Sequence, residues 1–235
     1  MNIGIIGAMD AEILHYRNSM KLVSQEEKAG ITFYTGTLNG FSVVICKCGV
    51  GKVNASVCTQ ILIDQFSVSH VIFTGVAGAL APDLHIGDIV VSSEAMHHDM
   101  DATALGFEVG KIPYSEHHIF QADPHLQNLA LTVSGEVISE QKVRSGRILS
   151  GDQFIASREK VNELYQNLSG SCAEMEGAAV AQVCDMNKVP FVIIRSMSDE
   201  ADGSAKVNFL EFTEKAAFHS YKIVDGMLKS WQSFQ

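Results

Sequence analysis

Short apolar runs alternate along the chain with longer segments that have helical periodicity. Each apolar run predicts a strand, at residues 3–6, 32–36, 41–48, 71–73, 87–91 and 189–194. The periodic segments predict helices at about 10–20, 52–66, 124–133, 157–166, 176–186 and 210–228. Continuous apolar strands need helices on both faces. The pattern therefore predicts one three-layer α/β domain over residues 1–235, with a central mixed, mostly parallel twisted sheet flanked by helices.

Glycine-rich or acidic segments follow four of these apolar runs. They are residues 7–10, 49–51, 74–78 and 197–199. In α/β domains ligands bind at the carboxyl ends of the strands, so we expect these segments to surround a site. The 97–121 stretch is long for a plain connection and predicts a functional loop. In the 52–66 helix we expect the β-branched residues to face inward, namely Val53, Val57, Ile61 and Ile63.

Composition narrows the class of ligand. The chain has 27 acidic and 17 Lys or Arg residues, a formal net charge of -10, and no basic run. This charge argues against nucleic acid and favours a small neutral or zwitterionic molecule. No apolar run approaches the ~20 residues of a membrane span, and no basic segment opens the chain as in a signal peptide. Five scattered cysteines without a C-x-x-C pair predict free thiols and a cytoplasmic location.

The usual phosphate and metal motifs do not fit. The Walker pattern fails at Gly51-Lys52, because the first glycine position is Cys46 and Val53 follows the lysine. The dinucleotide fingerprint fails at Gly75 and Gly78, because Phe73 occupies its leading glycine position. His97 and His98 with the aspartates that follow resemble a metal cluster, but no second ligand set is spaced to complete a site. We therefore expect no metal and no organic cofactor.

Carboxylates are the stronger candidates for chemistry. Glu12 follows the first strand, Asp199 follows the most apolar one, and Glu174 and Glu176 stand at the predicted start of a helix. Taken singly, each is explained by a helix dipole or an N-cap. Together, Glu12, Glu176 and Asp199 follow different strands and should meet at one edge of the sheet. Crowded carboxylates raise one another's pKa, and an acid with a water-activating base is the minimum for hydrolysing a glycosidic bond.

Seven segments in register resemble one known family. They are GIIGAMDAE (4–12), GVGKVNA (49–55), TGVAG (74–78), HDMDAT (98–103), SGDQFI (150–155), EME (174–176) and RSMSD (195–199). Together they resemble the 5′-methylthioadenosine/S-adenosylhomocysteine nucleosidases of the purine nucleoside phosphorylase-like superfamily. The likeness extends over nearly the whole chain. It implies a nucleoside phosphorylase-like fold, a homodimer, and hydrolysis of an adenine nucleoside in methionine salvage.

The resemblance implies a role for each matching residue. Asp199 would protonate purine N7, Glu12 would activate the attacking water, and Glu176 would hold the ribose hydroxyls. The base would stack on Phe154 and bond to the backbone of Ile155, while Met175 would pack beneath the sugar. Further pocket residues implied by the resemblance are Met9, Val50, Val76, Gly78 and Phe209. Three residues of the 97–121 loop would reach the 5′-alkylthio group across a dimer interface: Leu105, Phe107 and Pro113.

The same superfamily contains phosphorylases, which are the alternative. A phosphorylase must bind an anion beside the ribose, usually through arginines. The chain has five arginines, and none lies in segments 49–53 or 71–78. A carboxylate at Glu12 would also repel phosphate, so the sequence favours water as the nucleophile. Many relatives have Ser at the position of Val76, and Val76 resembles the variant of relatives that also accept 6-amino-6-deoxyfutalosine. Aromatic residues are frequent at the position of Leu105, which is not aromatic. These departures leave the 5′-substituent open, with 5′-deoxyadenosine as a further candidate.

Overall fold

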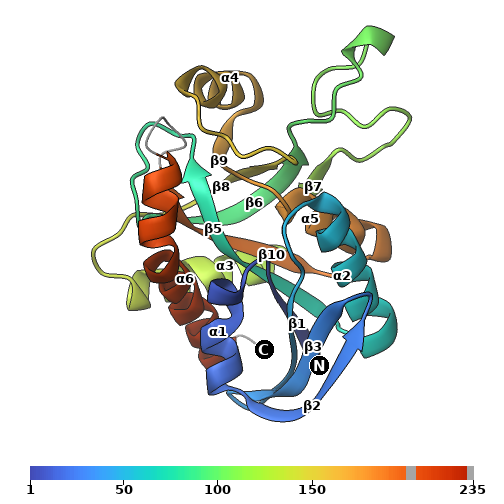
Figure 1. Cartoon of the computed structure of the whole chain (residues 1–235), viewed down its shortest axis with the longest axis vertical. Coiled ribbons are helices and arrows are strands. Elements are labelled where there is room, and N and C mark those ends of the chain that lie inside the picture. Colours follow the sequence, from blue (N-terminus) through green and yellow to red (C-terminus); the bar gives the residue numbers. More distant parts are fainter. Residues whose placement is uncertain (200–204, 232–235) are drawn as a thin grey trace.

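A single sheet flanked by helices runs through the computed structural model, which describes residues 1–199 and 205–231, with side chains from 212 onward in the last helix (Figure 1). The strands are β1 (Asn2–Gly7), β2 (Lys21–Lys28), β3 (Ile31–Leu38), β4 (Phe41–Lys47), β5 (His70–Ala79), β6 (Ile89–His97), β7 (Ile119–Gln121), β8 (Val143–Ser150), β9 (Gly170–Glu174) and β10 (Phe191–Asp199). The helices are α1 (Asp10–Ser19), α2 (Lys52–Phe66), α3 (Pro124–Val137), α4 (Arg158–Leu168), α5 (Gly177–Asn187) and α6 (Ala205–Ser230), with a 3-10 turn at Thr103–Leu105.

Half of the sheet closes on itself. The order is β10-β6-β8-β9-β5-β1-β4-β3-β2, and β10 also pairs with β5, so five strands form a ring. Five of the ten strand pairings are parallel, among them β1 with β4 and β5 and β10 with β5. The antiparallel pairings lie mainly in the β2–β3–β4 meander and at β6, β7 and β9. The predicted α/β class with a mixed sheet is confirmed.

Alternate residues of the central strands enter two separate cores. Ile6, Val44 and Phe73 pack on one face with α2 and α5. Ile5, Ile45 and Ile72 pack on the other face with α1, α3 and α6 (Figure 1). The period-two alternation of side chains in a strand distributes these apolar residues between the two helical layers. The carboxyl ends of β1, β5 and β10 are thereby fixed relative to one another.

The inward face predicted for α2 holds for Ile61 and Ile63, which pack against the core, and is wrong for Val53 and Val57. Its buried residues are Ala55, Cys58, Thr59 and Leu62. Val53 and Val57 instead face solvent, with 74% and 40% of their surface exposed, and Ile61 and Ile63 are half-buried. Small residues line the buried stripe because α2 packs closely against α5, whose buried face is alanine, valine and cysteine. The valines form an exposed apolar stripe.

Candidate active site

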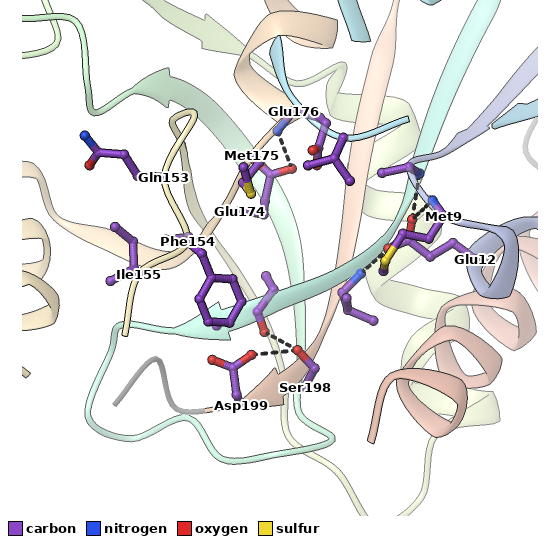
Figure 2. Close-up of a pocket in the computed structure, with 16 residues that line it drawn as sticks. Met9, Glu12, Gln153, Phe154, Ile155, Glu174, Met175, Glu176, Ser198 and Asp199 are labelled. Atoms are coloured by element: carbon purple, nitrogen blue, oxygen red, sulfur yellow. Dashed lines mark hydrogen bonds between the residues drawn. The ribbon is translucent and has the colours of Figure 1, made fainter. Parts of the chain in front are cut away.

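A pocket opens where β1, β5, β9 and β10 end. It encloses about 600 Å³ including its mouth, a volume that suits a small organic ligand. Its walls come from segments far apart in the sequence, and Figure 2 shows the side chains that point into it. The lining residues are Ala8, Met9, Glu12, Val50, Val76, Ala77, Gly78, Gln153, Phe154, Ile155, Ala173, Glu174, Met175, Glu176, Ser198 and Asp199.

Glu12 is held rigidly at one end of the pocket. It is the third residue of α1, and its Oε2 accepts hydrogen bonds from the backbone N–H groups of Ala8 and Met9 at 2.6 and 2.9 Å. Its Oε1 accepts from the Val76 N–H of β5 at 2.9 Å. Burial raises the pKa of Glu12 above its usual value and outweighs the opposing effects of Arg195 and these backbone donors. The carboxyl group is oriented and is a stronger base than one in water.

Asp199 closes the opposite end of the pocket. It is the last residue of β10 and is buried. The Ser198 hydroxyl donates to Asp199 Oδ1 at 2.7 Å (Figure 2). A β-bulge between Met197 and Asp199 shifts the register of β10 against β5 at this point. Bulges re-aim side chains, and here the strand end delivers the carboxyl group to the pocket that the Phe154 ring also lines (Figure 2).

Glu176 lines the wall of the same pocket. It is the N-cap residue of α5, and the Gly51 N–H, just before α2, donates to its Oε1 at 2.8 Å. Burial, together with the neighbouring Glu174 carboxylate, raises the pKa of Glu176 to about 8. A carboxyl group with this pKa is mostly protonated near neutral pH, and a modest change in its surroundings would ionise it.

Glu174 anchors the wall from behind. Contrary to the expected helix start, it ends β9, and the Gly177 N–H donates to its Oε1 at 2.9 Å. The Ser150 hydroxyl also donates to Oε1. Arg195 Nη2 forms a buried ion pair with Glu174 Oε2 at 2.6 Å, and its guanidinium lies 4.0 Å from the Phe73 ring centre. These contacts satisfy the Glu174 charge and fix the first turn of α5, which carries Glu176.

Ten of the predicted site residues line this one pocket: Glu12, Glu176, Asp199, Met9, Val50, Val76, Gly78, Phe154, Ile155 and Met175. Three others lie elsewhere in this chain, on the loop between β6 and β7. Of these, Leu105 has 70% of its surface exposed, and Phe107 and Pro113 are half-buried. The Phe209 side chain lies outside the described residues.

The sequence prediction gave no role to Glu174, Ser150, Ser198 or Arg195. Arg195 and Ser198 lie inside the most apolar strand segment, where a buried arginine is a signal in itself because it requires a carboxylate partner. Ser150 ends β8, which was not predicted, so nothing placed it beside β9. Among the side chains that the structure describes, four carboxylates and no lysine or arginine line the pocket.

The two adjacent histidines do not line the pocket. His97 ends β6 and its Nε2 is 2.9 Å from Gln182 Oε1 of α5. His98 follows, and both residues are buried. Burial lowers the pKa of both imidazoles, which favours their neutral forms. His98 packs against Gly151, where an added Cβ would lie 2.5 Å from the ring. Shaping this turn is the role that the geometry supports.

Comparison with known proteins places the chain in a family. Residues 2–229 match the profile of the phosphorylase superfamily. The 5′-methylthioadenosine/S-adenosylhomocysteine nucleosidase of Shewanella loihica is 43% identical over 230 residues, covering 97% of this chain and 99% of that protein. The chain belongs to the 5′-methylthioadenosine/S-adenosylhomocysteine nucleosidases. The predicted resemblance is confirmed, and so is the enzyme class, an N-glycosyl hydrolase.

Solved structures of this nucleosidase family have the same fold. The Colwellia psychrerythraea enzyme, solved with adenine, is 42% identical and superposes with a TM-score of 0.92 over 97% of this chain and 94% of its own. The futalosine hydrolase of Helicobacter pylori is 35% identical, with a TM-score of 0.93 and 98% of both chains covered. Membership of the nucleosidases does not favour the phosphorylase alternative.

Proposed function

We propose that Asp199, Glu12 and Glu176 together cleave the N-glycosidic bond of 5′-methylthioadenosine and S-adenosylhomocysteine in this pocket, releasing adenine. The observation that carries the proposal is the charge of the pocket wall. Four carboxylates surround the cavity, and among the residues that the structure describes no lysine or arginine lines it to hold phosphate. An oxocarbenium-like transition state carries positive charge on the ribose, which Glu12 and the ionised form of Glu176 would stabilise. Water is then the nucleophile.

Asp199 is assigned as the general acid. A purine stacked on Phe154 would place N7 toward Asp199, whose carboxyl group the Ser198 hydroxyl orients. Protonation of N7 lets the electron pair of the C1′–N9 bond leave with a neutral adenine. The backbone of Ile155 would bond to the base edge, in keeping with its place on the pocket wall.

Glu12 is assigned as the base. Three backbone N–H groups fix both of its oxygens, so the carboxylate has one orientation toward the cavity. It takes the proton of a water whose oxygen forms the new bond to C1′. The raised pKa of Glu12 favours this transfer. Glu176 would accept hydrogen bonds from the ribose hydroxyls, with Met175 beneath the sugar, and Met9, Val50, Val76 and Gly78 would complete the pocket.

The 5′-substituent is proposed to extend toward the open side of the pocket. Val76 is the residue whose family variation accompanies acceptance of 6-amino-6-deoxyfutalosine, and a futalosine hydrolase is among the structural relatives. Adenine release from 5′-methylthioadenosine, adenosylhomocysteine, 5′-deoxyadenosine and aminodeoxyfutalosine would rank these substrates. We expect turnover of the first two and, through Val76, of aminodeoxyfutalosine as well.

We further propose a homodimer. The exposed valines of α2, Val53 and Val57, continue toward Val50 at the pocket mouth. The β6–β7 loop adds exposed Leu105 and Tyr114. Exposed apolar groups of this kind are typical of protein interfaces. In a dimer, Leu105, Phe107 and Pro113 of one subunit would approach the 5′-substituent bound in the other.

A cytoplasmic location is also proposed. It is supported by five buried cysteines that form no disulfide, as expected in a reducing compartment. Among the residues that the structure describes, no helix is long and apolar enough to cross a membrane.

The assignment of Asp199 is tested with Asp199→Asn. The amide can donate a hydrogen bond but cannot transfer a proton to N7, so kcat should fall by about 10²- to 10⁴-fold, the usual contribution of general acid catalysis. Binding of adenine, measured by calorimetry, should change little because shape and stacking remain. A variant with the wild-type kcat would remove Asp199 from the acid role.

A further inference from the structure

Three loops meet beside the pocket and are joined by one charged network. They are the turn before α2, which contains Gly51, the residues after β6, which contain Asp99, and the residues after β8, which contain Asp152. None of Lys52, Asp99 and Asp152 lines the pocket. Lys52 and Asp152 are nevertheless only one or two residues away in sequence from residues that line the pocket, Val50 on the ribose side and Gln153 and Phe154 on the base side.

Asp99 is the centre of this network. Lys52 Nζ lies 2.7 Å from Asp99 Oδ1 and 2.8 Å from Oδ2. The Asp152 N–H donates to Asp99 Oδ2 at 3.0 Å. The Asp99 and Lys52 side chains are only 14% and 22% exposed, so solvent screens this ion pair less than a surface pair. One carboxylate thus ties α2 to the loop after β8.

Asp152 closes the network from the other side. Its Oδ1 accepts the backbone N–H of Lys52, the first residue of α2, at 2.9 Å. Gly51, with a φ of 99°, precedes it and turns its own N–H toward Glu176 Oε1, 2.8 Å away. A side chain at Gly51 would be strained by that φ and would lie 3.2 Å from Asp152 Oδ1.

The network therefore connects the two binding walls of the pocket. Asp152 is two residues from Phe154, and Gly51 donates directly to Glu176. The groups assigned to chemistry are held elsewhere. Glu12 is fixed by Ala8, Met9 and Val76, and Asp199 is oriented by Ser198. Loosening the network should move the base-stacking ring relative to the ribose carboxylate and leave the acid and the base in place.

We infer that Asp99, through its ion pair with Lys52, is a positioning residue that sets the spacing between Phe154 and Glu176 and so governs nucleoside affinity. The inference rests on the proposed function, since it takes the pocket to hold base and ribose at these two walls. It gives Asp99 no contact with the substrate. Its signature is a change in KM without a matching change in kcat.

The experiment compares Asp99→Asn, Lys52→Met and the double variant with wild type, using 5′-methylthioadenosine for kinetics and adenine for calorimetry. A matched control is the pair Asp83→Asn and Lys142→Met, a second Lys–Asp ion pair whose side chains are 51% and 45% exposed. Asparagine keeps the shape and the acceptor for the Asp152 N–H and removes the charge. If Asp99→Asn fails to fold, Lys52→Met tests the same contact from the other side.

We expect each single variant to raise KM about ten- to hundredfold, because hydrogen bonds to charged groups contribute on that scale. The kcat value should stay within about threefold of wild type, since the acid Asp199 and the base Glu12 keep their own hydrogen bonds. The double variant should be no worse than the more impaired single variant, because both remove one interaction. Adenine affinity should fall in parallel, and the Asp83 and Lys142 variants should match wild type.

An unchanged KM in both Asp99→Asn and Lys52→Met, or a fall in kcat without a rise in KM, would overturn the inference. Either result leaves the proposed function intact, provided that the wild-type enzyme releases adenine. If wild type releases no adenine from 5′-methylthioadenosine, the proposed function itself is wrong.

Discussion

Glu12 and Glu176 are both buried, but their carboxyl groups are stabilised differently. Three backbone N–H groups fix Glu12, whereas among the described residues Glu176 accepts from one backbone N–H, that of Gly51, and has the Glu174 carboxylate as its neighbour. Burial and this neighbour raise the pKa of Glu176 to about 8. The ribose hydroxyls of a bound substrate would add hydrogen-bond donors to Glu176 and would favour its ionised form.

The raised pKa of Glu176 has a consequence for stability. In the folded protein Glu176 keeps its proton up to about pH 8. In the unfolded chain its pKa returns to the usual 4.5, so it loses the proton at a much lower pH. Between these values the folded state binds the extra proton. The free energy of unfolding should therefore fall as pH rises through this window, by up to about 1.4 kcal/mol per pH unit from this group, and level off above pH 8.

Urea unfolding of wild type and Glu176→Gln between pH 5 and pH 9 measures this contribution. The variant should gain stability relative to wild type as pH rises toward about 8. The exposed Glu163, paired with Lys160 on α4, provides the control variant Glu163→Gln, which should track wild type. A constant difference between Glu176→Gln and wild type across this range would contradict the raised pKa.

At the scale of elements, periodicity predicted the long helices and the central strands well. The bounds of α2 coincide with the predicted 52–66, because a glycine precedes the helix and its apolar pattern ends at Phe66. The prediction missed β2, whose residues are mostly polar and almost all exposed on the sheet edge, as well as β8 and the short β7 and β9. It also placed Val53 and Val57 of α2 inward, since hydrophobicity alone does not reveal that close helix packing favours alanine over valine.

The site could be predicted to the extent that its residues stand in order along recognisable segments. Glu12 and Asp199 were found because they follow predicted strands that meet at one edge, and Glu176 because it stands at the predicted start of a helix. Glu174 and Arg195 were present in the same segments, but their pairing depends on β9 lying near β10 across β5. Sequence spacing carries no information on such a contact between distant strands.

Gly75 of β5 makes the coupling between element and site testable. An added Cβ would overlap Glu12 Oε1 and lie 3.2 Å from Arg195 Nη1. Gly75→Ala should therefore displace the base, and kcat should fall by about 10²-fold, as small misplacements of catalytic groups do. As a control, Gly135→Ala in α3 meets nothing within 4 Å and should keep full activity. Wild-type kcat in Gly75→Ala would show that Glu12 tolerates displacement and is not the oriented base.

At the scale of the whole molecule, the exposed valines of α2 test the proposed dimer. Val53→Glu combined with Val57→Glu places two charges in the proposed interface and should yield monomers in sedimentation velocity. The KM for 5′-methylthioadenosine should rise, because the partner's loop no longer covers the 5′-substituent, while adenine affinity should hold. Val23 on the edge strand β2 is 73% exposed, almost as much as Val53, so Val23→Glu is a matched control that should stay dimeric.

If the wild-type protein sediments as a monomer and turns over 5′-methylthioadenosine normally, the dimer proposal fails. The pocket of one subunit would then be complete. If the double variant is monomeric but keeps the wild-type KM, the dimer proposal for the wild-type protein stands. The partner's β6–β7 loop would then have no part in substrate binding.

The central claim is that a pocket walled by carboxylates uses water, not phosphate, to cleave the glycosidic bond. The most direct measurement is turnover of 5′-methylthioadenosine in phosphate-free buffer made with H₂¹⁸O, followed by mass spectrometry of the ribose product. We predict that adenine is released at full rate and that each freshly released 5-methylthioribose carries one ¹⁸O at C1. Adenine release that appears only when phosphate is added, with a ribose 1-phosphate as the product, would contradict the account.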